Sequence, residues 1–114
     1  MQDCIFCKIV AGDIPGDIVF RDEQVLAFRD INPVAPVHIL IIPTKHIVKL
    51  TDIPDGEMSL MANMMQVAKD LAIKEGIQDK GYRLVINNGE DGRQIVQHLH
   101  MHLLGGRRLS ERLV

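Results

Sequence analysis

Gln97-His98-Leu99-His100-Met101-His102-Leu103-Leu104 holds three of the chain's five histidines at alternate positions. Side chains alternate between the two faces of a β-strand, so a strand here puts the imidazoles on one face and the apolar residues on the other. On a helix the same positions would fan out by about 100° per residue, and the imidazoles would share no face. The stretch therefore predicts a strand with one chemical face and one core face.

Three neighbouring imidazoles suit reaction with an anion near neutral pH. An imidazole titrates near pH 6.5, so the row can supply a nucleophile, a proton donor and a cationic anchor. Adjacent imidazolium charges would repel one another, which predicts mixed protonation states. His100 is the candidate nucleophile, because a backbone carbonyl can orient its ring. The residues alone leave a metal site and a solvated edge strand as alternatives.

The composition is that of a globular protein, and we expect a single domain over 1–114. Hydrophobic residues make up 46% and charged residues 25% of the 114 positions. The net charge of -2 and the pI near 6.2 argue against a surface for polyanions. Nucleic acid is therefore not an expected partner, whereas a mononucleotide needs only local donors.

The chain shows no signal for export or for a membrane. It begins without a basic segment followed by a long apolar run, and the apolar run 39–42 is far shorter than the roughly 18 residues of a membrane span. Cys4 and Cys7 are too few for a disulfide framework. A cytoplasmic location is therefore expected.

Five strands and two helices are predicted, joined by short turns. Asp3 is the expected N-cap of a short helix over 4–10 that ends at Gly12. Alternating residues between turn signals predict four strands in addition to the histidine strand: 17–21, 25–30, 37–43 and 82–87. This arrangement favours an antiparallel α+β domain.

A long helix is expected over 55–75, with Gly76 ending it. Its apolar stripe at helical spacing consists of Met61, Met64, Met65, Ala68, Leu71 and Ala72. The methionines of this helix either fill the core or face a second subunit.

The segment 98–104 matches the H-φ-H-φ-H-φ-φ signature of the histidine triad family, where φ is an apolar residue. Gly105-Gly106-Arg107 resembles the nucleoside phosphoramidate hydrolase branch of that family, the Hint-type proteins. The likeness covers nearly the whole chain, through Cys4-Ile5-Phe6-Cys7-Lys8-Ile9-Val10, Phe28-Arg29-Asp30-Ile31, His38 to His46 and Asn87-Asn88-Gly89.

The resemblance implies a fold and an activity. The fold is a five-stranded antiparallel sheet with one long and one short helix, pairing as a homodimer. The activity is hydrolysis of purine nucleoside 5′-phosphoramidates to the nucleoside monophosphate and an amine through a nucleotidyl-histidine. This chemistry needs no metal.

The resemblance also implies residue roles. It assigns the nucleophile to His100, lets His102 bind a phosphate oxygen or protonate the leaving group, and places His98 and His38 in support. The backbone of 92–95 would offer N–H donors to phosphate. The residues that it implies in nucleotide binding are Asp30, Ile31, Asn87, Arg93, Gln94, Ile95, His100 and His102.

Two positions depart from the Hint-type pattern. Arg93 stands where glycine is frequent, and Ile95 where serine is frequent. Isoleucine cannot donate a hydrogen bond to the leaving group. Arg93 either adds positive charge near the phosphate or is solvated. The C-terminal arginines (Arg107, Arg108 and Arg112) are either solvated or border a partner subunit's site.

Cys4 and Cys7 form a Cys-x-x-Cys pair that can supply two of the four zinc ligands of a tetrahedral site. Some bacterial histidine triad proteins with a similar beginning bind zinc, and that resemblance implies His46 and His98 as the other ligands. Reduced, buried thiols are the alternative. A redox pair is a weaker one, because no βαβ unit surrounds the motif.

Other functions fit the same residues less well. A dinucleoside polyphosphate hydrolase would use the same triad, although Gly105-Gly106-Arg107 counts against it. Nucleotide transfer to a sugar phosphate fits worse, because that branch usually carries glutamine at the position of His102. A nucleotide-binding sensor or scaffold, or a zinc-dependent structural protein, would not require turnover.

Overall fold

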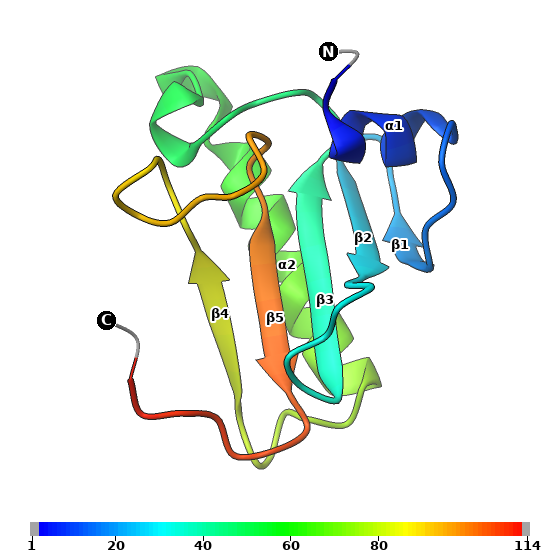
Figure 1. The fold of residues 1–114 in the computed structure, drawn as a ribbon, viewed down its shortest axis with the longest axis vertical. Coiled ribbons are helices and arrows are strands. Elements are labelled where there is room, and N and C mark those ends of the chain that lie inside the picture. Colours follow the sequence, from blue (N-terminus) through cyan, green and yellow to red (C-terminus); the bar gives the residue numbers. More distant parts are fainter. Residues whose placement is uncertain (1–2, 113–114) are drawn as a thin grey trace.

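The computed structural model describes residues 3–112 and builds one antiparallel sheet in the order β1-β2-β3-β5-β4. The long helix α2 packs across one face of the sheet, over β3 and β5, whereas the short helix α1 lies at one end of the opposite face (Figure 1). The elements are α1 (Ile5–Ala11), β1 (Ile18–Arg21), β2 (Val25–Arg29), β3 (Val37–Pro43), α2 (Ser59–Lys74), β4 (Tyr82–Ile86) and β5 (Met101–Gly105). The predicted α+β class is confirmed.

Strand alternation divides the core between the two faces. In β2, Val25 and Ala27 pack with α2, whereas Leu26 and Phe28 face the side of α1. β3 is buried along its whole length and alternates in the same way. Its residue on the α1 side nearest the start of the strand is His38, which therefore enters the interior beside an apolar cluster.

Helix α1 begins one residue later than predicted. Cys4, not Asp3, is the N-cap, and its Sγ accepts a hydrogen bond from the backbone N–H of Cys7 at 3.3 Å. The predicted end is confirmed: Gly12 has a φ of 80°, a left-handed conformation that favours glycine.

The predicted helix over 55–75 is divided in two. A 3₁₀ turn (Asp55–Glu57) follows Pro54, and the α-helix runs from Ser59 to Lys74. Such turns are frequent at helix ends, where backbone groups lack α-helical partners. No helix within residues 3–112 has the length and apolar character of a membrane span.

The buried stripe of α2 is shifted from the predicted one. Met65 is 48% exposed, whereas Leu60 and Val67 are buried. Because the helix contacts β3 and β5 along a line through Met64, Ala68 and Leu71, Met65 lies at the edge of the buried arc.

Strand β5 starts at Met101, so the prediction of a regular strand through His98 is wrong. Extending the register beyond Ile41 and Met101 by two positions sets Leu99 opposite Pro43, the last residue of β3, which has no N–H for a sheet hydrogen bond. The N–H of Leu99 donates to the carbonyl of Ile47, outside the sheet, at 2.7 Å. The alternation survives, since Leu99, Met101 and Leu103 are all buried against α2.

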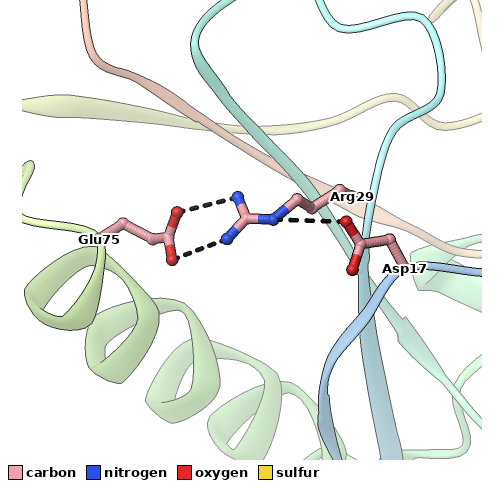
Figure 2. Close-up of polar contacts among 3 residues, drawn as sticks. All are labelled: Asp17, Arg29 and Glu75. Carbon is pink, nitrogen blue, oxygen red and sulfur yellow. Dashed lines mark hydrogen bonds and ion pairs between the residues drawn. The ribbon is translucent and has the colours of Figure 1, made fainter.

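A bidentate ion pair ties the end of β2 to the end of α2 (Figure 2). The guanidinium of Arg29 donates to both carboxylate oxygens of Glu75, at 2.9 Å each, and its Nε lies 3.8 Å from Asp17. The hydrogen bonds to Arg29 hold the pKa of Glu75 below its ordinary value. This clamp fixes the strand end that precedes Asp30.

We expect Glu75→Gln to lower the free energy of unfolding by about 1–2 kcal/mol, because it leaves a partly buried guanidinium without its bidentate partner and with only the longer contact to Asp17. Urea denaturation at pH 7 measures the change. Glu57→Gln is the matched control: its pair with Lys45 is largely exposed, and the expected loss is below about 0.5 kcal/mol. Equal losses in the two variants would contradict a special role for the clamp.

Candidate functional site

A hollow of about 520 Å³ opens between α1, the strand ends and the loop from β4 to β5. One wall is apolar and includes Phe6, Ile9, Ile14, Phe28 and Leu40. The other carries the polar groups Asp30, His38, Asn87, Arg93, His100 and His102. The space is suited to a ligand with one apolar and one charged end.

His100 lies on the floor of this hollow with 6% of its surface exposed. Its Nδ1 is 2.7 Å from the carbonyl oxygen of His98. A carbonyl only accepts hydrogen bonds, so Nδ1 carries the ring proton and donates it there. The lone pair of Nε2 is therefore free, as a nucleophile requires. Phe6 packs edge-on against the ring, with centroids 5.2 Å apart.

A second chain of hydrogen bonds determines which ring nitrogen of His102 carries the proton. The backbone N–H of Val34 donates to Nδ1 of His38 at 3.2 Å, so the proton of His38 is on Nε2. That Nε2 is 3.0 Å from Nδ1 of His102 and 3.4 Å from the carboxylate of Asp30. When His38 donates to His102, the remaining N–H of His102 is at Nε2, away from His38.

Burial keeps these rings neutral. It lowers the pKa of His38 and of His100, and the charge of Asp30 opposes the shift only in part. The pKa of His102 falls to about 4, because burial and the neighbouring histidines His100 and His38 all disfavour its charged form. The prediction of mixed protonation states is therefore wrong: near pH 7 the rings are all neutral and differ only in tautomer, so that His100 presents a lone pair and His102 an N–H.

The side chain of His98 lies apart from those of His100 and His102. Its ring is fully buried beside Cys4, Cys7 and His46 and does not line the hollow. Only its carbonyl reaches His100. The four side chains of this group come from the start of α1, the segment after β3 and the segment before β5.

The Cys4/Cys7/His46/His98 group has the dimensions of a zinc site. All four ligand atoms lie within 4.8 Å of one another. Nδ1 of His98 lies 3.3 Å from the sulfur of Cys4 and 3.6 Å from that of Cys7, and Nδ1 of His46 lies 3.2 Å from the sulfur of Cys7. Tetrahedral zinc with these ligand types places ligand atoms about 3.3–3.8 Å apart. Nε2 of His98 donates to the carbonyl of Pro43 at 2.8 Å, which leaves Nδ1 free as a ligand.

Asp30 and Ile31 lie at the mouth of the hollow, where β2 ends. One oxygen of Asp30 accepts the backbone N–H of Asn32 at 2.8 Å, and the other faces His38. Ile31 is 88% exposed. An apolar side chain held in water beside a carboxylate can cover a base while the carboxylate accepts from ribose hydroxyls.

Gln94 holds the loop between β4 and β5 from inside. Its buried amide accepts from the N–H of Gly89 at 2.9 Å and donates to the carbonyls of Val48 and Val96. The N–H groups of Arg93 and Gln94 bond to carbonyls within the loop. These two donors are therefore used, so only the rest of the segment 92–95 can offer N–H groups to a phosphate.

Sequence reasoning missed residues that act through others. Phe6 packs on both His98 and His100, and its place inside the Cys-x-x-Cys motif was the available signal. Asn88 accepts the N–H of Leu50 at 2.8 Å and so anchors the loop. Arg107 donates to the carbonyl of Val34 at 2.7 Å, which ties the C-terminal segment to the loop that supports His38.

Comparisons with known proteins agree with this geometry. A model of the HIT domain matches residues 11–109. The purine nucleoside phosphoramidase of Escherichia coli (strain K12) is 47% identical over 112 residues, which are 98% of this chain and 94% of that protein. A HIT family hydrolase from Legionella pneumophila is 51% identical, with coverage of 96% and 97% and a TM-score of 0.92. A zinc-bound histidine triad family protein from Mycobacterium smegmatis is 35% identical, with coverage of 99% and 81% and a TM-score of 0.79. The chain belongs to the HIT domain family.

We expect the free energy of unfolding to fall between pH 7 and pH 5, and His102→Gln to reduce that fall by about 1–2 kcal/mol. The folded pKa of about 4 lies below the ordinary 6.5, so the unfolded chain binds more protons in this range. The contribution is complete above about pH 6.5 and is lost as the pH falls toward 4.

Urea denaturation of both proteins at the two pH values measures this difference. Comparing the two proteins cancels the other groups that titrate in the same range. An equal fall in the variant and the wild type would show that His102 is not a buried neutral ring.

Proposed function

We propose that this protein hydrolyses purine nucleoside 5′-phosphoramidates to the nucleoside monophosphate and an amine. The observation that carries the proposal is the free Nε2 of His100 in the same hollow as the N–H of His102. The 47% identity to a purine nucleoside phosphoramidase over nearly the whole chain supports the choice of substrate.

The hollow orients such a substrate by its chemistry. The base fits the apolar wall and the exposed Ile31, and the ribose hydroxyls fit the carboxylate of Asp30. The phosphate then faces the histidines, where His102 donates its N–H to a phosphate oxygen. Asn87 lines the same wall and can donate to the ribose or the phosphate.

The reaction has two steps. In the first step, the lone pair of Nε2 of His100 forms a bond to phosphorus while the P–N bond of the substrate breaks. The electron pair of that P–N bond leaves with the amine, which takes a proton from water. The hydroxide so formed attacks phosphorus, and the N–P bond to His100 returns its electrons to the ring. We assign His102 to binding a phosphate oxygen through its Nε2–H, and the proton for the amine comes from water.

We expect His100→Ala to lower AMP release from adenosine 5′-phosphoramidate by at least about 10³-fold, because it removes the attacking atom. Chromatographic separation of the nucleotides measures the rate, and mass spectrometry of acid-quenched wild type should detect the nucleotidylated chain. Diadenosine polyphosphates are tested in parallel.

Retention of AMP binding by His100→Ala would show that the variant is folded. Wild-type protein that binds AMP but cleaves neither substrate would refute the enzyme and favour a nucleotide-binding module. Sedimentation equilibrium of the wild type tests the homodimer that we also propose, which the edge strand β4 and its half-exposed Tyr82 allow.

We further propose that Cys4, Cys7, His46 and His98 bind one structural zinc ion, with the protein in a reducing cytoplasm. The donor set and its spacing fit zinc, and a relative in the family is zinc-bound. The ion would cross-link α1 to the two segments that flank the sheet.

We expect freshly purified protein to contain about one zinc per chain and Cys7→Ser to contain far less. Elemental analysis gives the stoichiometry. Chelation should also lower the midpoint of thermal unfolding of the wild type but not of the variant. Wild-type protein without zinc, at full stability, would favour the reduced buried thiols instead.

A further inference from the structure

The segment directly after β5 packs against the loop 30–36 that leads into β3. Gly106 has a φ of 91°, and a Cβ on it would lie 2.9 Å from Cβ of Pro36. A side chain at this position would therefore force the two segments apart. Their close approach brings Arg107 beside the loop, where Nη2 of its guanidinium donates to the carbonyl of Val34 at 2.7 Å.

This hydrogen bond is the polar anchor of the loop. Pro33 and Pro36 have no N–H to bond with. Within residues 3–112, the hydrogen bond from Arg107 is the only one between 31–36 and a residue outside 30–38. The side chain of Val34 is 58% exposed, so its packing does little to hold the backbone there. The position of the Val34 N–H therefore depends on Arg107.

The N–H of His38 has two acceptors within reach. Its Nε2 lies 3.0 Å from Nδ1 of His102 and 3.4 Å from a carboxylate oxygen of Asp30. A charged acceptor forms the stronger hydrogen bond, so an unconstrained ring would turn toward Asp30. The N–H of Val34, 3.2 Å from Nδ1 on the other side of the ring, holds the orientation that favours His102.

We propose that Arg107 is a positioning residue of the catalytic site, acting on His102 through Val34 and His38. The inference rests on the proposed hydrolysis of phosphoramidates, and it adds a residue that does not line the catalytic hollow. With the loop held, His38 donates to Nδ1 of His102, whose N–H at Nε2 then binds a phosphate oxygen. Without the anchor, His38 donates to Asp30, and part of the protein carries the proton of His102 on Nδ1 and cannot bind phosphate through Nε2.

Removal of the guanidinium tests this chain of contacts. We expect Arg107→Ala to lower kcat for adenosine 5′-phosphoramidate by about 5–10-fold, and Arg107→Lys, which keeps a donor, to recover most of the loss. Nitrogen NMR of protein with isotope-labelled histidine reads the tautomer directly. The Nδ1 signal of His102 should move from the unprotonated toward the protonated position in Arg107→Ala.

Two matched variants control for the loss of charge and for a loosened C-terminal segment. Arg108→Ala removes the neighbouring exposed arginine but keeps its backbone. Arg83→Ala removes a comparable hydrogen bond, the one that its guanidinium donates to the carbonyl of Ser110 at 2.7 Å. Both variants should stay within about 2-fold of the wild-type kcat and keep its nitrogen signals.

A double-mutant cycle separates action through His38 from a general weakening of the fold. In a His38→Phe background, Arg107→Ala should lower kcat by less than about 2-fold further. The same loss in both backgrounds, or a lowered rate with an unchanged His102 signal, would overturn the positioning role while the hydrolase stands. Wild-type protein that releases no AMP would refute the hydrolase, and the nitrogen signals, which need no turnover, would still decide whether Arg107 sets the tautomer.

Discussion

The hydrogen bond from Nδ1 of His100 to the carbonyl of His98 is the interaction on which the site depends. It spans 2.7 Å in a buried setting and decides which ring nitrogen of His100 keeps a lone pair. The accepting carbonyl belongs to a residue whose own ring is fixed twice, among the sulfurs of Cys4 and Cys7 and by the carbonyl of Pro43. One residue therefore joins the cysteine group, the end of β3 and the catalytic ring.

On the other side of the hollow, a backbone N–H rather than a carbonyl fixes a histidine tautomer. The N–H of Val34 fixes the tautomer of His38, and His38 in turn fixes His102. Arg107 binds the carbonyl of Val34, so both backbone groups of that residue are engaged. Because burial lowers the pKa of each triad ring, hydrogen-bond direction rather than charge distinguishes His100 from His102.

The sequence predicted what depends on local periodicity. The alternation in 98–104 correctly predicted that Leu99, Met101 and Leu103 share a buried face. The glycine at position 12 correctly predicted where α1 ends. The boundary of β5 was wrong because it depends on a proline in another strand. The shift of the helix stripe past Met65 depends on the angle at which α2 meets the sheet.

The candidate site divides in the same way. Its residue types could be predicted from the histidine spacing and the family resemblance, and the structure brings His38, His100 and His102 together. The tautomers and the separation of His98 could not be predicted, because they follow from contacts between segments distant in sequence. That Gln94 contacts the nucleotide stays a prediction, although its buried side-chain amide already bonds three backbone groups.

The side chains that support the catalytic histidines and those at the mouth of the hollow differ in how firmly the fold holds them. Supporting side chains such as Gln94 and His98 are hydrogen-bonded to buried backbone groups. Replacing one would leave those groups unsatisfied and shift the catalytic histidines. Ile95 packs against little and faces solvent, so a change there costs the fold little. A change at this mouth can therefore leave the histidine tautomers as they are. The departure from the Hint-type pattern at Ile95 falls at this mouth, where the fold tolerates it.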